Sequence, residues 1–162
     1  MSELYIRVIP MDPQWQPTEE AAARAADYVA ALFAGPGDHV ESVKPVFYER
    51  TTLIDSGEYL EDVVCPRCAA SIGVDWFWDL LIARNGGRRI GEPTIDELGV
   101  SVPCCGAALT LPELRFDGPV GFARFEVSAM NWTRHAWDLS DEELAAVGNI
   151  LGHQVTQVPA HY

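Results

Sequence analysis

The sequence has few basic residues, few cysteines and no long apolar stretch. Its 11 lysines and arginines face 24 aspartates and glutamates, which gives a formal net charge of -13 at pH 7. A surface of this sign repels the phosphates of nucleic acids and of anionic lipids, so we expect neither direct nucleic-acid binding nor membrane binding. Strong acidity is typical of soluble proteins and of proteins that bind a basic partner.

The start of the chain lacks the pattern of a secretory signal. Residues 1–12, MSELYIRVIPMD, show no basic segment followed by an apolar one, and no stretch is apolar over the thickness of a bilayer. These absences predict a cytoplasmic protein, and we expect a bacterial one. Thiols stay reduced in the cytoplasm, which argues against disulfides as the role of the four cysteines.

The N-terminal third of the chain shows the periodicity of a strand, a helix and a second strand. Residues 4–8 alternate as in a half-buried strand, and Thr18 is placed to cap a helix that ends at Gly35-Pro36-Gly37. Residues 43–54, VKPVFYERTTLI, are typical of one strand or a bent pair. The helix should bury the apolar residues that repeat at helical spacing: Ala22, Ala25, Ala26, Val29, Leu32 and Phe33.

The C-terminal third shows a similar pattern. Residues 120–130, VGFARFEVSAM, alternate as a strand, and Ser140 and Glu143 form a capping box that begins a helix ending at Gly152. Residues 153–158 are expected to form a last strand, ended by Pro159. The strand should bury one face, which carries Ala123, Phe125, Val127 and Ala129.

Outside the middle segment, this order is β-α-β-β-α-β, which is the order of an α+β, ferredoxin-like sandwich with both helices on one face of an antiparallel sheet. We therefore expect a single domain over residues 1–162. Residues 56–119 are rich in Gly, Pro and Cys and are expected to be a zinc-binding insert between strands 2 and 3. The insert should hold a short helix over residues 75–84, closed by Asn85-Gly86-Gly87. The sequence shows no internal repeat.

The four cysteines form two pairs, Cys65-x-x-Cys68 and Cys104-Cys105. Four thiolates arranged as pairs match the tetrahedral coordination that Zn(II) prefers. Neighbouring side chains of a strand point to opposite faces, so an adjacent pair can reach one ion only from irregular backbone. Pro103 and Gly106 flank the pair and favour such a backbone.

A redox role is the alternative that the first pair leaves open. Cys65-Pro-Arg-Cys68 follows two β-branched residues and is similar to the Cys-Pro-x-Cys site of glutaredoxin-like proteins, so the chain could be a thiol-disulfide oxidoreductase using Cys65 and Cys68. Such sites stand at the start of a long helix. Residues 69–73, AASIG, are a poor helix start, which favours the metal.

A characteristic set of residues accompanies the cysteines between positions 65 and 105. The set comprises Cys65, Cys68, Ile72, Gly73, Trp76, Leu98-Gly99 and Cys104-Cys105. At these positions the segment resembles the small zinc-bundle subunit of archaeal and eukaryotic RNA polymerases, known as subunit N or the tenth subunit. In that family all four cysteines bind one zinc ion, so the resemblance implies one structural Zn(2+) per chain. It also implies a transcription-associated accessory protein as a further alternative.

A zinc ion held by four cysteines has no open position for water or substrate, so it is expected to be structural. The histidines are scattered without metal-ligand spacing, and no Gly-x-Ser-x-Gly nucleophile motif is present. We therefore expect a non-enzymatic, acidic, zinc-stabilised protein-binding module with a basic protein partner. An immunity-type protein that neutralises a basic toxin is one form of this hypothesis.

Overall fold

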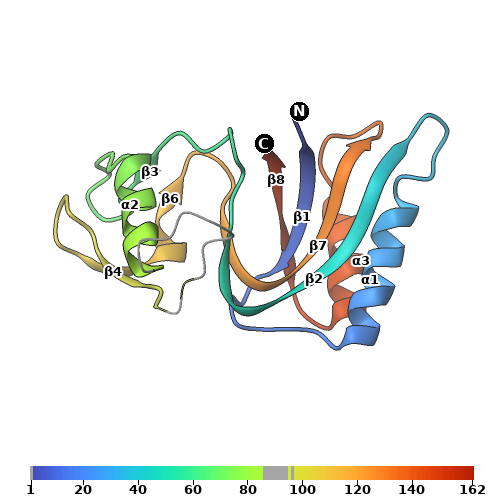
Figure 1. The fold of residues 1–162 in the computed structure, drawn as a ribbon, viewed down its shortest axis with the longest axis horizontal. Helices are drawn as coiled ribbons and strands as arrows, with labels where there is room; N and C mark the ends of the chain where they lie inside the picture. Colours follow the sequence, from blue (N-terminus) through green and yellow to red (C-terminus); the bar gives the residue numbers. More distant parts are fainter. Residues whose placement is uncertain (1, 86–94, 96) are drawn as a thin grey trace.

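The computed structural model describes residues 2–85, 95 and 97–162 and shows a mixed α/β fold (Figure 1). Its elements in chain order are β1 (Leu4–Pro10), α1 (Glu19–Ala31), β2 (His39–Ile54), β3 (Val63–Val64), α2 (Val74–Arg84), β4 (Gly99–Ser101), β5 (Ala108–Thr110), the 3-10 turn η1 (Leu111–Glu113), β6 (Arg115–Phe116), β7 (Gly121–Thr133), α3 (Asp141–Leu151) and β8 (Val155–His161).

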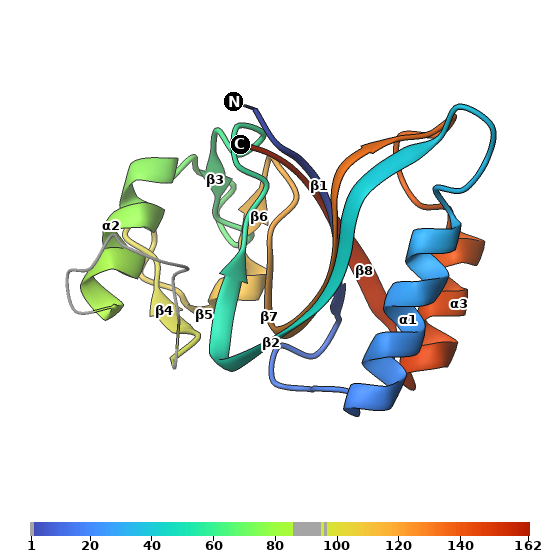
Figure 2. The same cartoon turned by 45° about the vertical axis from the view of Figure 1, so that its right-hand side comes forward.

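The main layer is a four-stranded antiparallel sheet in the order β2-β7-β1-β8. Helices α1 and α3 lie side by side on one face of this sheet (Figure 2). The opposite face is open and turns towards the segment that carries the cysteines. We call β1, β2, β7, β8, α1 and α3 the sandwich lobe, and the described residues between β2 and β7 the cysteine lobe.

The core of the sandwich lobe lies between the sheet and the two helices. Strand alternation and helical periodicity direct most of the expected residues into it. All the predicted residues of the first helix line this core, with Leu32 only half-buried. Of the predicted strand face, Phe125, Val127 and Ala129 lie in it, whereas Ala123 is buried in a separate small cluster. Thr18 and Ser140 cap α1 and α3 through side-chain oxygens that accept from Ala21 N and Glu143 N. The buried cluster comprises Ile6, Val8, Ala22, Ala25, Ala26, Val29, Phe33, Phe125, Val127, Ala129, Trp132, Leu139, Val147, Leu151 and Val155.

Strands β2 and β7 extend beyond the rest of the sandwich lobe, and their far ends reach the cysteine lobe. Between the pairs Phe47–Phe125 and Thr52–Ala123, β2 advances five residues while β7 advances two. This bulge bends the paired strands sharply, so that their far ends run back beside the open face of the sheet (Figure 1). Residues of this open face and of the far end of β2 line a hollow between the two lobes, which we call the trough.

The cysteine lobe has a hydrophobic core of its own. It contains α2 and two small antiparallel pairs, β3 with β6 and β4 with β5. The far ends of β2 and β7 contribute Leu53 and Phe122. The buried residues are Leu53, Leu60, Val63, Cys65, Phe77, Leu81, Ile95, Val100, Val102, Leu109, Leu111, Leu114 and Phe122.

Several predicted element ends are wrong: β2 already begins at His39, and β7 continues to Thr133. The last strand does not stop before Pro159 but continues to His161, because β8 is an edge strand and a proline there needs no partner for its missing N–H. Helix α1 ends at Ala31, earlier than the predicted Gly35-Pro36-Gly37. The short helix closes at Asn85 as expected, while Gly86 and Gly87 lie outside the described residues. No helix among the described residues is long and apolar enough to cross a membrane.

Candidate metal centre

The first cysteine pair lies in a tight loop directly after β3. The amide of Cys65 donates to the carbonyl of Ala70 (3.0 Å), and the amide of Ala69 donates back to the carbonyl of Cys65 (3.0 Å). Ala69 has a φ of 62°, an unusual conformation for a residue with a side chain. These bonds close the loop and bring the sulfurs of Cys65 and Cys68 to one side of it.

The second cysteine pair lies in the loop between β4 and β5. The amide of Val102 donates to the carbonyl of Ala107 (3.1 Å), and the amide of Gly106 donates to the carbonyl of Val102 (2.9 Å). Gly106 has a φ of 70°, which glycine adopts without strain. The irregular backbone expected around Cys104 and Cys105 is thus present.

The two loops have the same hydrogen-bond pattern and the same positive φ at the fifth residue, so residues 65–70 correspond to residues 102–107. The sequence alone did not reveal this repeat, because a valine replaces the first cysteine in the second loop. A proline at the second position of both loops was the available signal. The corresponding residues are Cys65 with Val102, Pro66 with Pro103, Cys68 with Cys105, and Ala69 with Gly106.

All four cysteine sulfurs lie within 4.8 Å of one another. The Sγ atoms of Cys65 and Cys105 are 3.9 Å apart, and those of Cys68 and Cys104 are 3.4 Å apart. None forms a disulfide. Four sulfurs placed tetrahedrally at the Zn–S bond length would be about 3.8 Å from one another, so the cluster has the dimensions of a four-thiolate metal site.

The thiols differ in how readily they ionise. The backbone amide of Cys68 donates to the sulfur of Cys65 and lowers the pKa of that thiol to about 7. Desolvation and hydrogen bonds with the neighbouring thiols raise the pKa of Cys104 to about 12. A metal ion bound at this cluster would displace the remaining protons, because thiolates and not thiols are its ligands.

The cluster is joined to the core of the cysteine lobe on one side and is open on the other. Cys65 is buried within that core, whereas Cys68, Cys104 and Cys105 are exposed. Helix α2 buries Phe77 against the same core. The exposed side leaves a path for an ion to enter, and the buried side links the position of the sulfurs to the packing of the lobe.

Histidine and acidic side chains outside the cluster have local structural contacts. His161 Nδ1 lies 2.9 Å from Glu58 Oε2, and the ring of His153 stacks on Trp15 with a centroid separation of 4.6 Å. Asp62 accepts from the hydroxyl of Ser71. Within the described ranges, no further group of His, Cys, Asp and Glu is arranged to hold a metal.

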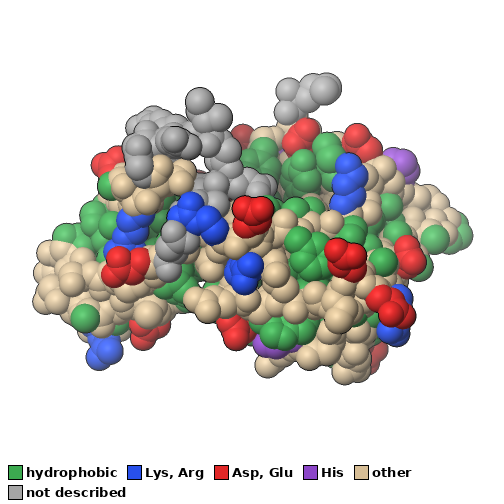
Figure 3. Space-filling view, turned by 60° about the horizontal axis from the view of Figure 1, so that its bottom comes forward, with side chains coloured by type: hydrophobic (Ala, Val, Ile, Leu, Met, Phe, Trp, Pro, Cys, Tyr) green, Lys and Arg blue, Asp and Glu red, His purple; other side chains and the backbone are tan. Residues whose placement is uncertain are grey.

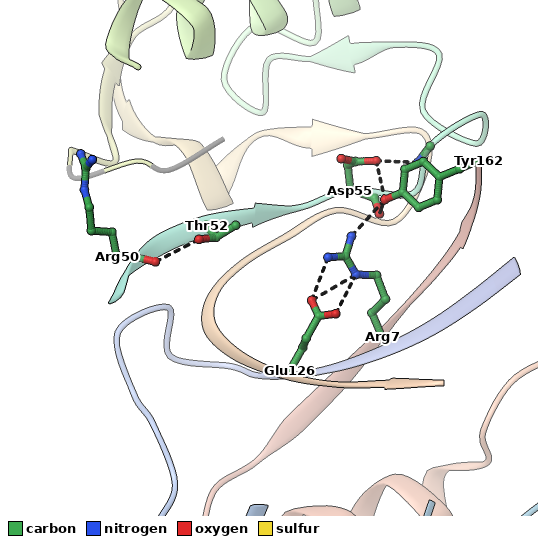
Figure 4. Close-up of polar contacts among 7 residues, drawn as sticks. Arg7, Arg50, Thr52, Asp55, Glu126 and Tyr162 are labelled. Carbon is green, nitrogen blue, oxygen red and sulfur yellow. Dashed lines mark hydrogen bonds and ion pairs between the residues drawn. The ribbon is translucent and has the colours of Figure 1, made fainter. Parts of the chain in front are cut away.

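A polar network beside the trough, with a buried ion pair at one end, was not expected from the sequence. Arg7 of β1 donates to Glu126 of β7 through Nε (3.1 Å to Oε2) and Nη2 (2.8 Å to Oε2), and through Nη1 to the hydroxyl of Tyr162 (3.0 Å). Tyr162 in turn donates to Asp55 (Figure 4). Burial alone would lower the pKa of Arg7, but the charge of Glu126 raises it above its ordinary value. Alternation placed Glu126 on the polar face of its strand, but nothing local pairs it with Arg7.

Comparison of the chain with protein-family models, with curated proteins and with solved structures gives no match.

Proposed function

We propose that Cys65, Cys68, Cys104 and Cys105 bind one structural Zn(2+) ion per chain. The observation that carries this proposal is the mutual proximity of the four sulfurs at the ends of two equivalent loops. Soft thiolate ligands favour zinc over hard cations, and four protein ligands leave no open position for chemistry. The ion would hold together two loops that are otherwise supported by short β pairs and by the hydrophobic core of the cysteine lobe, which is the usual role of a metal in so small a core.

Metal analysis of the native protein tests the zinc proposal directly. We expect one zinc per chain, and we expect the thiols to resist iodoacetamide until a chelator is added. Cys68→Ser should lose zinc, whereas Arg67→Ala, which changes an exposed residue of the same loop, should retain it. A metal-free protein, or thiols that react equally with and without chelator, would contradict the proposal, and neither of these results depends on a variant that folds.

We also assign the sandwich lobe to the ferredoxin-like fold, with residues 56–119 as its insert in a single domain of residues 1–162. The strand order β2-β7-β1-β8 and the two helices on one face support this assignment. The sandwich lobe has its own core and both helix caps, so it does not need the cysteine lobe to close it. A cysteine lobe that the sandwich lobe does not need for its own core supports a binding role for that lobe.

From these features we infer a non-enzymatic, acidic protein-binding module whose partner is a basic protein. The net charge of -13 supports this inference, since opposite charge steers association and raises its rate. Acidic side chains are spread over the face shown in Figure 3, with lysines and arginines among them. An immunity-type protein that neutralises a basic toxin is the concrete form of this function that we favour, in the cytoplasm of a bacterium.

Two variants of equal charge test this function in a pull-down from a lysate of the source organism. One replaces Glu61, Asp75 and Asp79 of the cysteine lobe by the corresponding amides. The other replaces Glu19, Glu20 and Asp27 of α1 in the same way. All six side chains are exposed.

We expect the wild type to capture a basic protein, the first variant to capture less of it, and the α1 variant to behave like the wild type. Equal capture by both variants would contradict a charge-guided surface on the cysteine lobe, and no basic partner at all would contradict the function. Recovery of RNA polymerase would instead support the transcription-associated alternative. A single fast-reacting thiol in metal-free native protein would support the oxidoreductase.

A further inference from the structure

The trough between the two lobes contains a cavity that the metal centre does not use. It has a volume of ≈390 Å³, within the range of small-ligand pockets, and it is lined by the open face of the sheet and by residues from the far end of β2. Three aromatic rings and three carboxylates dominate its wall. They belong to Tyr5, Tyr48 and Tyr162 and to Glu3, Asp55 and Glu126.

The charge of the wall is negative. The cavity has one arginine, Arg7, but its guanidinium is already paired with Glu126 at 2.8 Å. Lys44 pairs in register with Ser128, which also lines the cavity, but its side chain is exposed on the edge strand β2. Glu3 and Asp55 are therefore left as the carboxylates of the wall that no cation neutralises within the described part of the chain.

Both of these carboxylates have acceptor capacity left. Glu3 accepts one hydrogen bond, at Oε2, from the hydroxyl of Tyr5 (2.9 Å). Asp55 uses Oδ1 to accept from the amide of Gly57 (2.7 Å) and from the hydroxyl of Tyr162 (2.9 Å). Among the described residues nothing donates to Glu3 Oε1 or to Asp55 Oδ2, so each can bind a donor that enters from outside.

We propose that this cavity receives a lysine or arginine side chain of the basic partner, with its charged group between Glu3 and Asp55 and its aliphatic stem against the tyrosine rings. Aromatic faces and carboxylates together are the groups that bind organic cations. A cavity of this size admits one long side chain and not a folded segment of a protein. The proposal rests on the proposed function, because it assigns the cation to a protein.

The test uses the full-length, zinc-loaded protein and two small probes, N-acetyl-arginine amide and N-acetyl-citrulline amide. These probes have nearly the same shape, but only the first is charged. In ¹H–¹⁵N correlation spectra we expect the arginine probe to shift the amides of the cavity strands β1 and β7, and the citrulline probe to leave them unchanged. Equal responses to both probes, or shifts elsewhere in the chain, would overturn the proposal without any variant.

A pair of variants then assigns the contact. Glu3→Gln/Asp55→Asn keeps the hydrogen-bond acceptors that fix Tyr5, Gly57 and Tyr162, and it should weaken binding of the arginine probe by about tenfold or more. Glu19→Gln/Glu20→Gln removes the same charge from α1, on the other face of the sheet, and should leave binding unchanged. If the control weakens binding as much, the probe senses only the overall charge and the cavity is not the site.

The cavity and the proposed function can fail separately. If the partner is captured equally by the wild type and by Glu3→Gln/Asp55→Asn, the cavity proposal is overturned and the module function stands. If the arginine probe binds in the cavity but no basic partner exists, the module function is overturned, and with it the assignment of the cation to a protein side chain.

Discussion

The Arg7–Glu126 ion pair should behave as a buried pair, and breaking it from one side should destabilise the protein strongly. The side chain of Arg7 is 9% exposed and that of Glu126 is 3% exposed, and three hydrogen bonds join them. An exposed pair would contribute at most about 1 kcal/mol, whereas removing one partner of a buried pair costs about 3–5 kcal/mol. Because both side chains are buried, we expect the loss of either one to cost about 3–5 kcal/mol of unfolding free energy.

The two single variants should differ in a way that the chemistry dictates. Glu126→Gln leaves a guanidinium that cannot lose its proton, so its cost of about 3–5 kcal/mol should persist at every pH at which the protein folds. Arg7→Met leaves a carboxylate that can take up a proton, so its cost should be smaller at pH 5 than at pH 7. The double variant Arg7→Met/Glu126→Leu buries no charge and should lie within about 1.5 kcal/mol of the wild type.

Urea unfolding of the native protein measures these costs, with tryptophan fluorescence and circular dichroism as two probes whose curves should coincide. The double-mutant cycle should give a coupling energy of at least about 3 kcal/mol between the two residues. Single variants that each cost less than about 1 kcal/mol would refute the reasoning, because water would then have to reach the pair. A double variant as unstable as the singles would show that packing, and not charge, dominates this position.

Three further changes test other parts of the structure. Gly57→Ala should destabilise the protein more than Gly37→Ala. Both residues have positive φ, which costs an alanine about 1–2 kcal/mol, but only at Gly57 would a Cβ also meet a backbone carbonyl, that of His161. Equal unfolding free energies of the two variants would contradict this packing. Burial would raise the pKa of Glu143, but hydrogen bonds from Arg134 and from the amide of Ser140 lower this pKa overall. The ionised carboxylate therefore stabilises the folded protein fully above the pKa of the unfolded chain, and this stabilisation is lost as the pH falls through the lower pKa of the folded protein. Glu143→Gln should therefore reduce the melting temperature at pH 7 and change it little at pH 3, and an equal reduction at both would exclude the charge. Phe77→Ala should cost about 3–5 kcal/mol in chemical unfolding, since Phe77 is fully buried in the hydrophobic cluster that also contains Cys65. It should also weaken retention of the proposed metal, and retention at the wild-type level would separate the lobe core from the cysteine cluster.

The parts of the structure that depend on neighbouring residues could be predicted from the sequence. Alternation along β7 predicted that Phe125, Val127 and Ala129 face the helices, and Thr18 and Ser140 predicted where α1 and α3 begin. Both signals are local, because a strand repeats every two residues and a cap acts within one helical turn. The cysteine cluster was predictable for another reason, since four cysteines arranged as two close pairs match the ligand set of a tetrahedral metal site.

The remaining features depend on contacts between distant residues, and only the tertiary structure decided them. Arg7 and Glu126 are 119 residues apart and meet because β1 and β7 pair in one register, which no local pattern encodes. Pro159 stays within β8 because that strand lies at the edge of the sheet. The bend of β2 and β7 creates the trough and its cavity. In the second loop Val102 stands where the first loop has Cys65, and the fold of this loop instead brings Cys104 close to Cys65 and Cys68. Residue type and spacing determined which side chains were available, and strand pairing determined which of them meet.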